Sequence, residues 1–185
     1  MSIKYSRFKT EDELLKSVMR SSAFDKFPKV SAIGGKKINP DIDILQILNV
    51  SQGQSRLIGY EAKLIKFDSR SGRLSWNSFY NGIGQALLYL KNGVHRAAVI
   101  FGFHENVRDD SLIEGFNQWL WDNKDILKRI LGDHVSISIH LYDKGNITPT
   151  IEAGSDFYHS DEKIQLLSNE LLQGKFTFNR RLKNG

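Results

Sequence analysis

The feature that most constrains the fold is a short apolar run in the middle of the chain, at residues 97–103. Its sequence, Ala-Ala-Val-Ile-Phe-Gly-Phe, shows no alternation between apolar and polar residues. Such a run is typical of a strand that is covered on both faces, whereas a half-exposed strand alternates. We therefore expect residues 97–103 to form a central strand of a sheet that helices cover.

Other segments show the periodicities of helices and of strands. Capping residues followed by apolar residues at helical spacing predict helices over residues 11–20, 75–91, 111–131 and 161–172. Apolar runs between turn residues predict strands over residues 30–33, 42–50, 57–65 and 135–141, the first three largely antiparallel. This order of elements predicts an α/β or α+β fold with a mixed sheet flanked by helices.

The residues also predict several details of these elements. Ser75 is expected to cap the second helix, whose buried stripe should consist of Phe79, Ile83, Leu87 and Leu90. A capping box at Ser111 and Glu114 should open one unbroken helix that ends at Gly132. The strand at residues 135–141 alternates, which predicts one buried and one polar face.

Length and composition limit the domain organisation and the partners. A chain of 185 residues with 40% hydrophobic and 25% charged residues is expected to fold as one domain. The net charge of +5 and the pI of about 9.3 favour a polyanionic partner. Without cysteine, thiolate metal sites and thiol nucleophiles are excluded, so any metal must be bound by oxygen or imidazole. We find no signal peptide or membrane span, and we expect a cytosol-like, cytoplasmic location.

Charged residues alternate with apolar ones in two of the predicted strands. Glu61 and Lys63 should project from one face of their strand, and the same rule places Asp41 and Asp43 on one face, opposite Ile42 and Ile44. Charges in the middle of a sheet cost desolvation energy unless a partner such as a divalent cation compensates. Asp41 and Glu61 would then supply oxygen ligands to Mg²⁺, and Lys63 would hold an attacking water or offset phosphorane charge.

A simpler interpretation of these residues remains open. Glu61 and Lys63 can form a solvated ion pair on the strand surface, worth less than about 1 kcal/mol. The pairing with Pro40-Asp41, on the preceding strand and inside an apolar stretch, favours the site. The sequence also leaves open whether Asp41 or Asp43 is the ligand, and we select Asp41 because it follows the proline.

Pro40-Asp41 followed by Glu61-Ala62-Lys63 resembles the signature of the PD-(D/E)XK nuclease superfamily, which includes restriction endonucleases and Holliday-junction resolvases. The order of elements over residues 8–105 is similar to that family's core, with a helix-strand-helix extension over residues 106–185. The resemblance implies Mg²⁺- or Mn²⁺-dependent cleavage of DNA, less often RNA. It also implies that Asp41 and Glu61 bind the metal and that Lys63 lies beside the nucleophilic water.

The same resemblance implies roles for three further residues. Gln85 and Tyr89 are similar to a Gln-x-x-x-Tyr element that assists the metal site in exonuclease-like and resolvase-like members. From the residues alone, an amide and a phenol on a half-exposed helix face explain this spacing better. Glu11 matches a first-helix glutamate that reaches the metal in resolvase-like members, although stabilisation of a helix N-terminus also explains a carboxylate there.

Basic residues lie before and after the motif, at Lys36, Lys37, Lys66, Arg70 and Arg73. They are candidates for phosphate contacts, or else for a solvated loop. We expect an endonuclease that acts as a homodimer, because cutting two strands requires two sites. The alternative is a nucleic-acid-binding or assembly protein that keeps this fold without cleaving.

Overall fold

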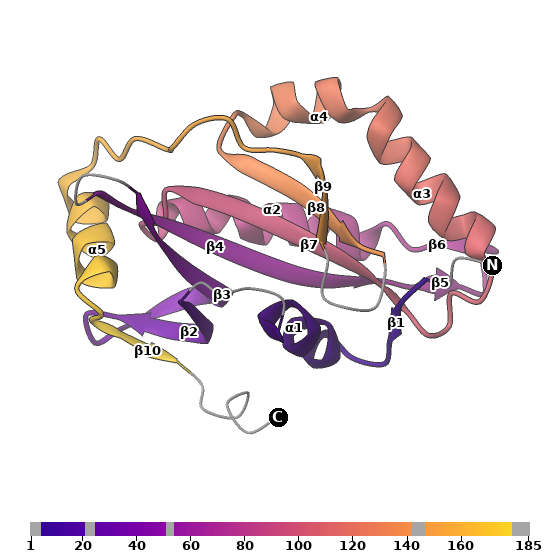
Figure 1. Ribbon diagram of the computed structural model, residues 1–185, viewed down its shortest axis with the longest axis horizontal. Coiled ribbons are helices and arrows are strands. Elements are labelled where there is room, and N and C mark those ends of the chain that lie inside the picture. Colours follow the sequence, from indigo (N-terminus) through magenta and orange to yellow (C-terminus); the bar gives the residue numbers. More distant parts are fainter. Residues whose placement is uncertain (1–4, 21–24, 51–53, 142–146, 179–185) are drawn as a thin grey trace.

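A mixed β-sheet forms the centre of the protein, and helices flank it (Figure 1). The structure is a computed structural model that describes residues 5–20, 25–50, 54–141 and 147–178. Its helices are α1 (Glu11–Arg20), α2 (Asn77–Lys91), α3 (Asp110–Asp122), α4 (Lys124–Leu131) and α5 (Glu162–Leu172). Its strands are β1 (Arg7–Phe8), β2 (Lys26–Ile33), β3 (Lys36–Val50), β4 (Gln54–Ile65), β5 (Phe67–Asp68), β6 (Arg73–Leu74), β7 (Arg96–His104), β8 (Val135–His140), β9 (Ile147–Ile151) and β10 (Phe176–Phe178).

The strands of the main sheet follow the order β10-β2-β3-β4-β7-β8-β9, and β1 pairs with the end of β7. β2, β3 and β4 are antiparallel neighbours, as the sequence predicts. β7 runs parallel to both β4 and β8, which confirms the central strand and the mixed sheet. Strands from the last third of the chain extend the sheet at both edges, with β8 and β9 on one side and β10 on the other.

Two apolar clusters cover the two faces of the sheet. The smaller one joins Leu14, Leu15 and Val18 of α1 to Ala62 and Leu64 of β4. The larger one includes Phe79 of α2, Phe101 of β7 and Phe116 of α3, whose rings contact one another. Because side chains alternate along β4 and β7, α1 and α2 pack on opposite faces (Figure 1).

The expected cap of α2 is wrong, and its expected buried stripe is confirmed only at Phe79 and Leu90. The helix begins at Asn77, and Trp76 precedes it without a side-chain capping hydrogen bond, so Ser75 has no such role. Ile83 is half-buried and Leu87 is 41% exposed, while the buried face contains Phe79, Gly82, Ala86, Tyr89 and Leu90.

Close packing explains this rotation of α2. A Cβ added to Gly82 would lie 3.0 Å from Cγ of Lys63 and 3.1 Å from Cγ1 of Val99. The helix therefore approaches the sheet through its smallest residues, and larger apolar residues turn outward. A stripe selected by hydrophobicity alone leaves out the small residues Gly82 and Ala86, which lie on the buried face of the helix.

Two expectations for the later elements also need correction. The helix over residues 111–131 is two helices that meet at Asn123, and the capping residue is Asp109, whose side chain accepts from Ser111 N. The predicted polar face of β8 is buried at Ser138 and His140. His140 is covered because it packs edge-on against Phe8 at 5.1 Å, and its Nε2 lies 2.9 Å from Ser17 Oγ.

The boundaries of α1, α5, β7 and β8 follow the sequence closely, whereas β2, β3 and β4 begin three to six residues before the predicted strands. α1 spans the predicted residues, and Thr10 Oγ1 accepts from Glu13 N as a capping box requires. β1, β9 and β10 and the β5–β6 hairpin are short elements that the periodicity does not predict. Within the described ranges, no helix combines the length and the apolar character needed to cross a bilayer.

The packing of Phe101 predicts a large effect on stability. Its fully buried ring stacks on Phe79 at 5.2 Å between centroids and contacts Phe116 at 6.0 Å. We expect Phe101→Ala to lower the free energy of unfolding by about 3 to 5 kcal/mol, since it leaves a cavity in the larger cluster. Urea unfolding measures this, with the exposed Leu88→Ala as a control that should change little. Equal losses in both variants would contradict this packing.

Candidate functional site

The site forms where two antiparallel strands separate. β3 and β4 pair from Val50↔Gln54 to Ile44↔Tyr60, and no further. Before Ile44, β3 follows β2 instead, and four residues, 38–41, bulge between the pairs Val30↔Ile42 and Ala32↔Lys37. β3 thus stays with β2 after it has left β4, and within the described residues no strand pairs with β4 beyond Tyr60 on that side.

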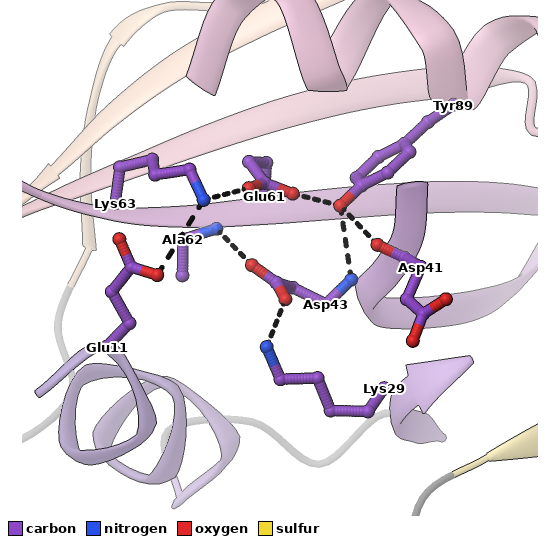
Figure 2. A network of polar contacts seen from close by, with 8 residues as sticks. All are labelled: Glu11, Lys29, Asp41, Asp43, Glu61, Ala62, Lys63 and Tyr89. Carbon is purple, nitrogen blue, oxygen red and sulfur yellow. Dashed lines mark hydrogen bonds and ion pairs between the residues drawn. The ribbon is translucent and has the colours of Figure 1, made fainter. Parts of the chain in front are cut away.

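The side chain of Asp43 accepts the hydrogen bond from β4 that a neighbouring strand would otherwise accept. Its carboxylate Oδ2 accepts a hydrogen bond from the backbone N–H of Ala62 at 3.0 Å. The other oxygen, Oδ1, forms an ion pair with Nζ of Lys29 from β2 (Figure 2). Asp43 is only 6% exposed, so this carboxylate is bound from two sides inside the sheet.

Glu61 lies on β4 beside this carboxylate and is 2% exposed. Its Oε1 is 2.6 Å from Nζ of Lys63, two residues along the strand, as the shared face predicts. Nζ of Lys63 also lies 3.7 Å from Oε2 of Glu11, at the start of α1 (Figure 2). Ala62 and Leu64 point to the opposite face, into the cluster with α1, which confirms the alternation expected for β4.

Tyr89 reaches the cluster from α2. Its fully buried hydroxyl donates toward the carboxylate of Glu61, lies 2.9 Å from the carbonyl oxygen of Asp41, and accepts from the backbone N–H of Asp43 at 3.3 Å. A Cβ at Gly59 would lie 3.0 Å from Cδ2 of the tyrosine ring, so glycine leaves room for the ring against β4. Tyr89 therefore ties α2 to both strands at the point where they separate.

The burial of these charges shifts their pKa values. Burial, and then the negative charge of Asp43, raises the pKa of Glu61 to about 7, although Lys63 and Tyr89 oppose this. Burial lowers the pKa of Lys63, but Glu61 outweighs it, with Glu11 and Asp43 adding to the effect, and the pKa lies above its usual range. Burial and the neighbouring carboxylates also raise the pKa of Tyr89, so its hydroxyl stays protonated as a donor.

The structure does not bring the side chain of Asp41 into this cluster. Asp41 is exposed, and its carboxylate points away while its backbone carbonyl faces Tyr89 (Figure 2). The expectation that Asp41 and Asp43 share a face is wrong, because Ile42 and Ile44 belong to different apolar clusters. The two-residue period therefore fails between Ile42 and Ile44, opposite Lys29 of β2, whose φ of 51° marks a local irregularity of the strand pair.

The other candidate residues take different positions. Gln85 is half-buried on α2 and lines a surface pocket with Lys63. Glu11 contacts Lys63 and is 41% exposed, so it lies at the rim of the cluster. The exposed basic residues form two separate groups, with Lys36 and Lys37 at the β2–β3 turn and Lys66, Arg70 and Arg73 around the β5–β6 hairpin. These two turns lie at opposite ends of the long axis in Figure 1.

Sequence reasoning missed Lys29 entirely. Its backbone has a φ of 51°, in the left-handed region that residues with a Cβ rarely adopt. That conformation accompanies the ion pair of Lys29 with Asp43. The only sequence signal is a lysine among the apolar residues of β2, which is too common to single out.

The donor set suits a small hard cation. Asp43 and Glu61 are buried carboxylates on neighbouring strands, close enough for the charge of Asp43 to raise the pKa of Glu61. Within the residues that the structure describes, no three His, Cys, Asp or Glu side chains gather as a metal-binding group. A divalent cation at Asp43 and Glu61 would thus take its remaining ligands from water and substrate, which is usual for Mg²⁺.

Comparison with known proteins does not assign the chain to a family, since neither the protein-family models nor the curated protein sequences give a match. The site is therefore interpreted from its own geometry and from the motif.

The raised pKa of Glu61 predicts a specific pH dependence of stability. Between about pH 4.5 and 7 the folded protein holds a proton on Glu61 that the unfolded chain has released. The stability from this proton is present near pH 4.5 and is lost as the pH rises to about 7. Relative to Glu61→Gln, which cannot titrate, the wild type should lose on the order of 2 to 3 kcal/mol of unfolding free energy across this window. Urea unfolding in EDTA measures the difference, and parallel pH profiles would contradict it.

Proposed function

We propose that the protein is a metal-dependent nuclease with a PD-(D/E)XK-type core, which hydrolyses phosphodiester bonds of DNA. The observation that carries this proposal is the buried cluster of Asp43, Glu61 and Lys63 where β3 leaves β4. An acid on one strand and an acid-x-lysine on the next match the family motif in residue type and order. The proposal places Asp43, rather than Asp41, in the position of the first acid.

The order of elements supports the same proposal. α1, β2, β3, β4, α2 and β7 follow one another as the family resemblance implies for a nuclease core. The central parallel pair of β4 and β7 places the motif strand inside the sheet. A solvated surface ion pair, the simpler interpretation, does not fit a glutamate that is 2% exposed.

The residues of the site have complementary roles in this reaction. Asp43 and Glu61 would hold Mg²⁺ or Mn²⁺, which supplies charge for the phosphate and lowers the pKa of its water. The raised pKa of Lys63 keeps its ammonium charged at neutral pH, where it orients the attacking water or offsets charge on the phosphorane. Tyr89 fixes the carboxylate of Glu61 from the α2 side, and Glu11 contacts Lys63 from the α1 side.

The proposed substrate follows from charge. The net charge is +5, and exposed basic residues lie both at the β2–β3 turn, before the bulge, and after β4. A backbone of phosphates that crosses the cluster would meet both groups, which makes binding strongly dependent on salt. Cleavage of both strands of a duplex would need two copies of the site, so we propose a homodimer for that reaction.

Variants of Asp43 and Lys63 test the proposed function. With Mn²⁺ or Mg²⁺ and plasmid or single-stranded DNA, we expect Asp43→Asn and Lys63→Met to cut about 100-fold more slowly than the wild type, or slower still. Asp41→Asn is the matched control and should stay within a few-fold, because its carboxylate lies outside the cluster. Circular dichroism checks that each variant folds.

The outcomes separate the alternatives. Cleavage that persists in Asp43→Asn and Lys63→Met would remove this site from the reaction. Loss of cleavage in Asp41→Asn alone would restore the assignment made from the sequence. Binding of DNA without cleavage under any of these conditions would favour a non-catalytic nucleic-acid-binding protein.

A further inference from the structure

A surface pocket adjoins the cluster on the side of α2. It has a volume of about 420 Å³, and Lys63 forms one of its walls. Its other lining residues come from successive turns of α2, namely Tyr80, Asn81, Gly84, Gln85 and Leu88. The pocket thus begins at the lysine that the proposed reaction places beside the phosphate.

The chemistry of the lining selects a flat, uncharged group. Tyr80 is 66% exposed, which leaves its aromatic ring open to a stacking partner. Gln85 lines the pocket, and its Oε1 is buried without a hydrogen-bond partner among the described residues, so turning the amide toward the pocket would offer this unsatisfied acceptor to a ligand. Asn81 adds an exposed amide, and Lys63 carries the single charge of the lining.

Different residues of the lining suit different parts of a nucleotide. An aromatic ring and two amides suit the face and the polar edge of a base, and Lys63, which lines the pocket and whose ammonium contacts Glu61 and Glu11, supplies positive charge for the phosphate. We propose that this pocket binds the nucleobase next to the scissile phosphate, with stacking on Tyr80 and a hydrogen bond to Gln85.

The inference rests on the proposed nuclease function and narrows its substrate. A base inside a pocket is unstacked and unpaired, so it must come from a single strand or be extruded from a duplex. The favoured substrate is therefore a single-stranded or unpaired segment of nucleic acid. Binding of paired DNA would require additional free energy to unstack the base.

Gly84, which lines the pocket, allows the pocket to be filled by a single substitution. A Cβ added to Gly84 meets no atom within 4 Å, and a larger side chain there would project into the pocket without disturbing the fold. Gly115 in the middle of α3 is equally open and lies outside the pocket. Gly115→Leu is therefore a matched control for the same change in a helix.

The experiment measures affinity without cleavage. Fluorescence anisotropy in EDTA compares a labelled single-stranded oligonucleotide with the same sequence as a blunt duplex. For Gly84→Leu and for Tyr80→Ala, we expect single-strand affinity to fall about tenfold, because the base loses its stacking site. Duplex affinity should stay within about twofold, and Gly115→Leu should bind both probes as the wild type does.

Other outcomes overturn the inference. One such outcome is that Gly84→Leu binds the single strand as tightly as the wild type does. Another is that Gly84→Leu or Tyr80→Ala loses affinity equally for the single strand and the duplex. A third is that the control Gly115→Leu loses affinity for the single strand. Displacement of the single strand by free deoxyadenosine monophosphate at lower concentrations than by unlabelled oligonucleotide would assign the pocket to a free nucleotide instead. Because binding is measured without metal, the binding experiment tests the pocket independently of cleavage. A protein that binds as expected but does not cleave would contradict the nuclease proposal and leave the pocket assignment standing.

Discussion

The site depends on the point where β3 leaves β4. If the two strands stayed paired beyond Ile44, the backbone N–H of Ala62 would bond to a strand carbonyl, as its neighbours do. Because β3 leaves β4 at Ile44 and continues along β2, that N–H donates to the carboxylate of Asp43. One irregularity of the sheet therefore creates the space for a charged group in the interior and supplies its first hydrogen bond.

The cluster is costly for folding, and its contacts reduce that cost. Each oxygen of Asp43 and Glu61 has a contact with a protein donor, from Ala62, Lys29, Lys63 or Tyr89. Replacing such a buried ionic network by apolar residues is often neutral or stabilising. Burial and the charge of Asp43 raise the pKa of Glu61 even though Lys63 and Tyr89 contact it, so these contacts only partly offset the cost of its charge. A divalent cation would add positive charge to that of Lys29 and Lys63 and would favour the ionised form of both carboxylates.

The sequence predicts the parts of the fold that follow regular periods. The apolar run of β7, the antiparallel β2, β3 and β4, and the shared face of Glu61 and Lys63 all depend on simple alternation or its absence. It fails where alternation is interrupted, as between Ile42 and Ile44, which lie in different apolar clusters. It also fails where packing overrides hydrophobicity, as at Gly82, and where a contact joins distant segments, as between Lys29 and Asp43. These features depend on three-dimensional contacts that a local pattern does not encode.

The most direct test of the central claim is to locate a bound cation. Crystals soaked with Mn²⁺, with anomalous data collected near the manganese edge, report its position without relying on activity. The account predicts one anomalous peak within about 2.5 Å of carboxylate oxygens of both Asp43 and Glu61, with Lys63 beside it. A peak bound through Asp41 instead, or no peak at the cluster under saturating Mn²⁺, would contradict it.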